Sequence, residues 1–166
     1  MTGAERKVGE LGLDIPDYAH PPYGRRYGPM KPFHRIGNLL QLSGLTPENR
    51  AGERLHPGVV GDDVTIEQGY AAARLTAIHT LGMIRYAIGS LDNVAGLSRA
   101  LCFVVCPPGF ELLHEVSNGA SDLFLEVFGG EIGSMGRASI GATSLSRGNC
   151  FELWLDLECV PGSTAS

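Results

Sequence analysis

Residues 65–106, TIEQGYAAARLTAIHTLGMIRYAIGSLDNVAGLSRALCFVVC, decide the fold because they join a long helix to a buried strand. Thr65 can cap the helix, and Gln68 three residues later completes a capping box. Gly89 predicts the end of this helix, because glycine is the residue that most often follows the last helical turn. Apolar side chains at steps of three and four predict one buried stripe: Ile66, Tyr70, Ala73, Ala77, Leu81, Ile84 and Ile88. The nearly continuous apolar run at 97–106 predicts a strand covered on both faces.

Shorter elements flank this unit on both sides. In chain order we expect a hairpin over 33–43 that turns at Gly37-Asn38, a polar loop over 46–64, a second helix over 110–128 that ends at Gly129-Gly130, and final strands at 137–142 and 150–159. Together with the central unit this gives the order ββαβαββ. Such an order predicts an α+β fold in which one mixed sheet carries two helices on one face.

A length of 166 residues fits one domain. Residues 1–29 are rich in Gly, Pro and Tyr without periodicity, so we expect an irregular N-terminal arm there. Residues 30–160 form the single predicted domain, and 161–166 a loose tail.

The charge balance excludes several function classes. With 13 Lys+Arg against 18 Asp+Glu the net charge is −5, which argues against a general nucleic-acid or anionic-membrane binder. No apolar run reaches the ~20 residues that a membrane span needs. The opening MTGAERKVGELGLD lacks the apolar core of a signal peptide, so we expect a cytoplasmic protein.

The four cysteines lie in or beside apolar runs, as small buried thiols do. Cys102 and Cys106 on one strand would be ~13 Å apart, too far to share an ion. We therefore expect no metal site.

The last two strands carry the candidate chemistry. If they pair as a hairpin that turns between Ser144 and Leu145, Arg137 lies opposite Glu152 and on the same face. Alternation along the strands then predicts an apolar face under the helices, formed by Ala138, Ile140, Phe151, Leu153, Leu155 and Leu157, and a second face with Arg137, Ser139, Cys150, Glu152 and Trp154. An arginine can hold a substrate carboxylate through two hydrogen bonds, and a glutamate can deprotonate a water. The same pair could also be a cross-strand ion pair that only stabilises the hairpin.

Two stretches resemble the RidA/YjgF family of enamine/imine deaminases. GPMKPFHRIGNLLQLSGLTP (28–47) is similar to the family's opening hairpin, and GRASIGATSLSRGNCFELWLDLE (136–158) to its closing one, where an Arg precedes a Glu by fifteen residues. The segments NGASDLFLEVFG and LGLDIP resemble a divergent branch of the family.

The resemblance implies a fold similar to that of the small chorismate mutases, assembled as a homotrimer with clefts between subunits. It also implies amino-acid-derived enamines and imines as substrates. Arg137 would bind the substrate carboxylate and Glu152 would activate the hydrolytic water.

Further residues are assigned to substrate binding by the same resemblance. Backbone groups near Ser43 and Gly44 would line the cleft, and Ser139 stands where the family often has Cys. Met30 replaces the family's tyrosine and cannot donate a hydrogen bond. The family's helix asparagine corresponds to Asn118 or to Ser121.

We therefore expect a hydrolytic deaminase that converts a carboxylate-bearing enamine or imine to a 2-oxo acid and ammonia without a cofactor. The alternative is a non-catalytic module of the same fold that binds a small carboxylate. A ribonuclease, the label that some relatives carry, is disfavoured by the net charge and by the lack of a basic stripe. The sequence leaves open whether residues 1–29 cover the cleft.

Overall fold

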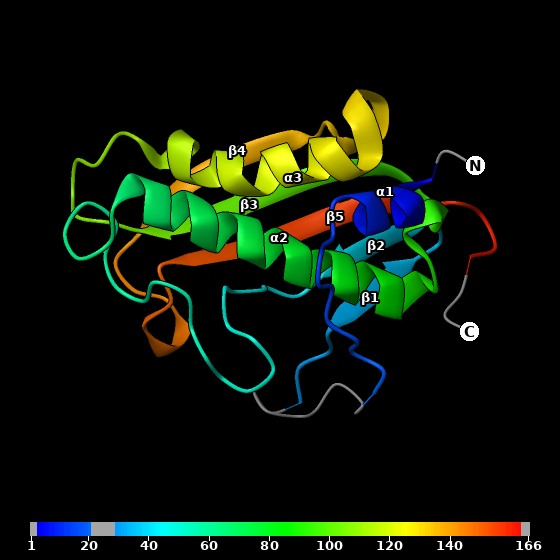
Figure 1. Ribbon diagram of the computed structural model, residues 1–166, viewed down its shortest axis with the longest axis horizontal. Coiled ribbons are helices and arrows are strands. Elements are labelled where there is room, and N and C mark those ends of the chain that lie inside the picture. Colours follow the sequence, from blue (N-terminus) through cyan, green and yellow to red (C-terminus); the bar gives the residue numbers. More distant parts are fainter. Residues whose placement is uncertain (1–2, 21–28, 164–166) are drawn as a thin grey trace.

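The computed structural model describes residues 3–20 and 29–163. Two long helices lie side by side on one face of a five-stranded mixed sheet (Figure 1). The elements are α1 (Ala4–Glu10), β1 (Phe33–Ile36), β2 (Leu39–Leu42), α2 (Ile66–Ile88), β3 (Val94–Val105), α3 (Leu113–Gly133), β4 (Gly136–Ala142) and β5 (Phe151–Cys159), with short 3-10 helices at Leu91–Asn93 and Ser146–Gly148. The predicted order ββαβαββ is confirmed, with α1 added before it. Within the described ranges, no helix is long and apolar enough to cross a bilayer.

The ends of α2 form as the sequence predicts. The Thr65 hydroxyl accepts from the backbone N–H of Gln68, whose side chain accepts from the backbone N–H of Thr65 in return. Gly89 follows the helix with a φ of 82°, a backbone conformation that favours glycine. A single sequence-local motif therefore fixes each end of the longest helix.

The second helix continues beyond its predicted end. Gly129 interrupts α3 with φ 77° and ψ 173°, as expected, but one more helical turn follows. Earlier in α3, Gly119 approaches α2 so closely that an added Cβ would lie 2.1 Å from the carbonyl oxygen of Tyr70. The absence of a side chain at Gly119 thus sets the spacing between the two helices.

The sheet order β1-β2-β5-β3-β4 overturns the predicted closing hairpin. A helix that connects two strands places them parallel and side by side, and α3 does this for β3 and β4. β5 then pairs with the other edge of β3, so β3 separates the two strands that we expected to pair. Arg137 lies beside Ala100 and Glu152 beside Phe103, not opposite one another.

The two faces of β4 are also reversed relative to the prediction. Ser139 donates from its hydroxyl to that of Ser117 on α3, at 2.9 Å, and therefore faces the helices. Ala138 and Ile140, predicted to lie under the helices, are exposed on the opposite face of the sheet. The prediction for β5 is confirmed, because its alternate residues from Phe151 to Leu157 are buried.

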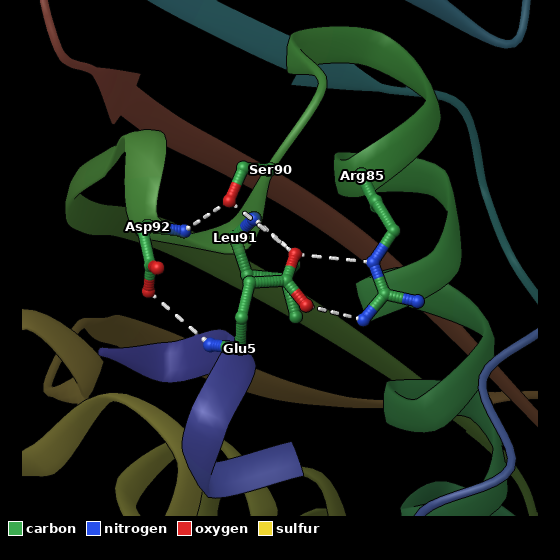
Figure 2. A network of polar contacts seen from close by, with 5 residues as sticks. All are labelled: Glu5, Arg85, Ser90, Leu91 and Asp92. Carbon is green, nitrogen blue, oxygen red and sulfur yellow. Dashed lines mark hydrogen bonds and ion pairs between the residues drawn. The ribbon is translucent and has the colours of Figure 1, made fainter. Parts of the chain in front are cut away.

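The first segment of the chain is more ordered than the predicted irregular arm. Helix α1 is attached to the core by Glu5, whose carboxylate accepts from Arg85 at 3.1 and 2.5 Å and from the backbone N–H of Leu91 at 2.9 Å (Figure 2). Asp92 accepts from the backbone N–H of Glu5, and an added Cβ at Gly3 would clash with it. Residues 1–2 and 21–28 of the predicted arm lie outside the described residues.

Part of the predicted loose tail is also fixed. Ser163 is buried, and the guanidinium of Arg35 donates to its carbonyl oxygen. Residues 164–166 lie outside the described residues.

We expect Glu5→Gln to lower the free energy of unfolding at pH 7 by about 1 kcal/mol. Burial alone would raise the pKa of Glu5, but the hydrogen bonds from Arg85 and Leu91 outweigh it, so the pKa is lowered. A lowered native pKa contributes stability above the unfolded pKa, and this contribution is lost as the pH falls through the native value. Urea unfolding at pH 7 and pH 3 measures the difference, which should shrink at pH 3.

A matched control is Glu10→Gln on the same helix, because Glu10 pairs only with exposed Arg6 and Lys7 among the described residues and should matter little. An equal loss for Glu5→Gln at both pH values would contradict the role of its charge.

Candidate active site

The face of the sheet opposite the helices contains a pocket of about 570 Å³. It lies where β2 and β5 separate, and its wall includes apolar, acidic, basic and hydroxyl side chains. Its lining residues are Met30, Gln41, Leu42, Ser43, Gly44, Thr46, Arg99, Ser146, Asn149, Glu152, Trp154 and Asp156. Four of the predicted site residues, Met30, Ser43, Gly44 and Glu152, are therefore brought together.

The pocket arises from a local irregularity between β2 and β5. Gln41 lies beside Asp156, and the chain returns to the same strand where Leu45 and Leu153 exchange backbone hydrogen bonds of 3.0 and 2.8 Å. Three residues of one segment thus stand against two of the other, as in a β-bulge. The extra residue moves the 42–44 segment away from a regular ladder and brings Gly44 against Glu152.

The Glu152 carboxylate has one fixed and one available oxygen. Trp154 donates from Nε1 to Glu152 Oε1 at 2.7 Å, and its ring packs on Phe103 with the centroids 5.6 Å apart. Oε2 has no hydrogen bond to any residue in the described part of the chain. Trp154 is 48% exposed, although its indole is largely apolar. Glu152 is thus oriented by one bond while its second oxygen can accept from a bound molecule.

The pocket wall includes Met30, the residue that the resemblance aligns with a tyrosine. The Ser43 hydroxyl donates to the carbonyl oxygen of Lys31, and the Ser43 N–H to that of Pro32 at 3.0 Å. These bonds hold the segment that follows Met30 beside β2. Met30 is 42% exposed and lines the pocket.

Arg137 belongs to a second group of polar residues, between β4 and α3. Its Nη1 donates to Asn118 Oδ1 at 3.0 Å and to Ser121 Oγ at 2.8 Å, so both candidates for the helix position contact it. Nε and Nη2 make no hydrogen bond to the residues that the structure describes, and Arg137 has no carboxylate partner there. The guanidinium is half-buried on the edge strand of the sheet with two donor nitrogens available.

The prediction that Arg137 and Glu152 share one face is wrong within a single chain. Arg137, Ser139 and Asn118 lie on the helix side of the sheet, whereas Glu152 lies on the open side. The guanidinium that lines the Glu152 pocket is that of Arg99, which pairs with Asp156 at 2.8 Å.

Sequence reasoning missed both Arg99 and Asn149 as pocket residues. Arg99 lies on the predicted strand 97–106, and this was the one available signal for its position. Alternate residues of a strand point to the same face, so Arg99 and Leu101 share one face of the sheet. Asn149 falls in a turn, and its neighbours come from distant segments, so no local spacing identifies it.

Three of the four cysteines are buried thiols, as predicted. All four are free, and Cys102, Cys150 and Cys159 are buried, whereas Cys106 is partly exposed. Burial raises the pKa of Cys102 and of Cys150 to about 11, so both stay protonated at neutral pH. Among the residues that the structure describes, no three His, Cys, Asp or Glu side chains gather as metal ligands would.

We expect Gly44→Ala to displace the Glu152–Trp154 pair, because an added Cβ would lie 2.1 Å from Glu152 Oε1 and 2.7 Å from Trp154 Nε1. Trp154 is the single tryptophan of the chain, so its emission spectrum measures the change directly. Gly96→Ala is the matched control on the same sheet, since a Cβ there meets nothing within 4 Å. An unchanged spectrum in a folded Gly44→Ala protein would contradict this packing.

Comparisons with known proteins agree with this architecture. A family model described as "YjgF/chorismate mutase-like, putative endoribonuclease" matches residues 5–147, which include Arg137 but not Glu152. The chain is 37% identical over 117 residues to Protein TCP17 of Trypanosoma cruzi, covering 70% of this chain and 72% of that protein.

Two solved structures are similar to this chain over most of its length. A protein of unknown function from Agrobacterium tumefaciens, Atu1372, is 32% identical with a TM-score of 0.81, covering 94% of this chain and 91% of its own. A structure from Shewanella oneidensis that bears the name "putative endoribonuclease" is 26% identical with a TM-score of 0.84, covering 94% and 99%. The family match spans well over half of the chain, and the protein is therefore a divergent member of the YjgF/chorismate mutase-like family.

Proposed function

We propose that the protein hydrolyses a carboxylate-bearing imine or enamine to a 2-oxo acid and ammonia, in clefts that form between copies of the chain. The observation that carries this proposal is the separation of the two groups of site residues. Each group is arranged for a ligand, yet they lie on opposite faces of one sheet. Arg137 of one copy and Glu152 of another can serve one substrate only if the copies assemble.

The uncovered face of the sheet supports such an assembly. Leu101, Phe103, Ile140 and Trp154 lie on it, and no described helix packs over them. An exposed group of large apolar side chains is typical of a surface that another subunit covers. The edge strand β4 carries Arg137 at the border of the same surface. In a closed ring of copies, such as a homotrimer, every cleft would contain Arg137 of one copy and Glu152 of the next, and the clefts would be equivalent.

Arg137 would bind the substrate carboxylate. Asn118 and Ser121 hold its Nη1, which leaves Nη2 and Nε as a pair of donors for two parallel hydrogen bonds. This anchor places the neighbouring C=N carbon in the cleft, and Ser139 lies two residues further along the same strand. Met30, Ser43 and Gly44 would line the other side of the cleft.

Glu152 would act as the general base. Its Oε2 takes a proton from water while the water oxygen forms a bond to the carbon of the protonated imine, and the π electrons move to the nitrogen to give a neutral carbinolamine. Glu152 then gives this proton to the carbinolamine nitrogen. The C–N bond breaks and ammonia leaves while the hydroxyl oxygen forms the C=O bond and its proton passes to the Glu152 carboxylate, which releases it to solvent. An enamine first becomes the protonated imine by protonation at carbon. Each step moves protons and water only, so the reaction uses no metal or cofactor.

We expect Glu152→Gln to lower turnover by ~10²-fold or more, because the amide loses the basic oxygen. The substituted side chain keeps an oxygen that can accept from Trp154, so the pocket should stay intact. Arg137→Lys is expected to raise KM instead, since a point charge replaces a two-pronged donor. Ammonia release from imines generated in solution by an amino-acid oxidase measures both effects. Full activity in a folded Glu152→Gln protein would contradict the proposed base.

A mixing experiment tests the shared cleft. Arg137→Ala and Glu152→Gln proteins should each be almost inactive alone, but co-expression in equal amounts should restore both native side chains in about one third of the clefts of each mixed trimer, which is about one quarter of all clefts. We expect ammonia release at about that fraction of the native rate. No recovery in mixed trimers, verified by two different affinity tags, would contradict a site built from two copies.

The non-catalytic carboxylate-binding module remains the second candidate, and Met30 is the observation that favours it. A thioether at the position of the family's tyrosine cannot donate to a substrate. In that case 2-oxo acids would bind, Arg137→Ala would abolish binding, and Glu152→Gln would leave both binding and the background rate of imine hydrolysis unchanged.

A further inference from the structure

A row of polar side chains crosses the open face of the sheet at one end of the pocket. Arg99 on β3 lies beside Asp156 on β5, and Asp156 lies beside Gln41 on β2. Residues that are partners across neighbouring strands point to the same face, so the three side chains stand side by side. All three line the pocket that contains Glu152. This end of the pocket therefore presents a guanidinium, a carboxylate and an amide.

Arg99 is the cation that this row offers to a ligand. It is the one Lys or Arg among the described residues that line the pocket. Its Nη2 donates to Asp156 Oδ2 at 2.8 Å, whereas Nε and Nη1 make no hydrogen bond to any residue in the described part of the chain. The side chain of Arg99 is 60% exposed and that of Asp156 only 18%. Asp156 thus holds one nitrogen of the guanidinium and leaves the N–H groups of the other two available.

The row stands at a distance from Glu152 that an extended substrate can span. Asp156 follows Glu152 by four residues on the same strand, which corresponds to roughly 13 Å of backbone. Trp154 lies between them on the same face, and its neighbour on β3 is Leu101. The pocket thus has an acid at one position, an apolar stretch in the middle and an arginine beyond it. This order suits an aliphatic chain that ends in a second anionic group.

We propose that Arg99 binds a second carboxylate, at the end of the substrate side chain, while Glu152 acts at the C=N carbon. This inference rests on the proposed function and narrows its substrate class to imines and enamines derived from dicarboxylic amino acids. The available N–H groups of Arg99 would donate to the distal carboxylate, and Arg137 of another copy would bind the carboxylate beside the reacting carbon. A neutral side chain of the same shape would gain no such bonds, so Arg99 would determine specificity.

Pairs of stable 2-oxo acids that differ in carboxylate against isopropyl test the inference without turnover. We would compare 2-oxoglutarate with 5-methyl-2-oxohexanoate and 2-oxoadipate with 6-methyl-2-oxoheptanoate by titration calorimetry at low ionic strength. At one or both lengths the dicarboxylate should bind about tenfold more tightly. The preference should weaken as salt is added, because the charge of Arg99 is largely exposed.

Arg99→Gln should reduce this ratio to about one while the affinity for the isopropyl compound stays unchanged, which also shows that the pocket is intact. Arg99→Glu should reverse the preference, because it places a like charge beside the distal carboxylate. Arg6→Gln is the matched control and should keep the preference. Arg6 is a similarly exposed arginine, 55% against 60%, that pairs with the carboxylate of Glu10 on α1, away from this pocket.

Equal affinities within both pairs would overturn the inference, and so would a dicarboxylate preference that survives in Arg99→Gln. A clear preference that depends on Arg99, without ammonia release from the matching imines, would instead overturn the proposed hydrolysis and leave the role of Arg99 standing.

Discussion

The position of β3 between β4 and β5 is the constraint on which the rest of the structure depends. The helical connection through α3 makes β3 and β4 parallel neighbours, and β5 pairs antiparallel on the other side. This arrangement puts Arg137 against α3 and Glu152 on the open face. One chain therefore presents two separate sets of polar groups, and the proposed reaction, which needs both, depends on how copies of the chain meet.

On the open face, a small unit of three residues organises the pocket. Gly44 leaves room for the Glu152 carboxylate, and Trp154 fixes one oxygen of that carboxylate by a hydrogen bond. The irregular pairing of β2 and β5 creates the space for this unit. The pocket is thus a product of backbone register, and its side chains are placed by strand pairing that spans more than a hundred residues of sequence.

The elements with local signals could be predicted, and those set by distant pairing could not. Three predicted features each involve only a few neighbouring residues and can be recognised in the sequence: the capping box at Thr65, the glycine at the end of α2 and the Gly37-Asn38 turn. Strands adjacent in sequence often pair, which is why a β4–β5 hairpin was predicted. The connection through α3 instead places β4 parallel to β3, at the edge of the sheet away from β5. Four of the seven predicted site residues share one pocket and the other three share the α3–β4 junction. Asn149 Nδ2 donates to Ser146 and toward Glu48, and the contact with Glu48 has no signature in the local pattern.

The tight crossing of the two long helices at Gly119 has a consequence for how sequence changes propagate. Gly119 follows Asn118 directly, and its contact with the backbone of α2 limits how closely α3 can approach α2. The spacing between α2 and α3 therefore helps to set the position of Asn118 and Ser121 relative to the guanidinium of Arg137. The backbone atoms of Tyr70 and Arg74 on α2 lie closest to Gly119, so a change in the course of α2 at this point would move Asn118 and Ser121 relative to β4. Substitutions in α2, a helix that makes no hydrogen bond to Arg137 within the described residues, can therefore alter the surroundings of its guanidinium.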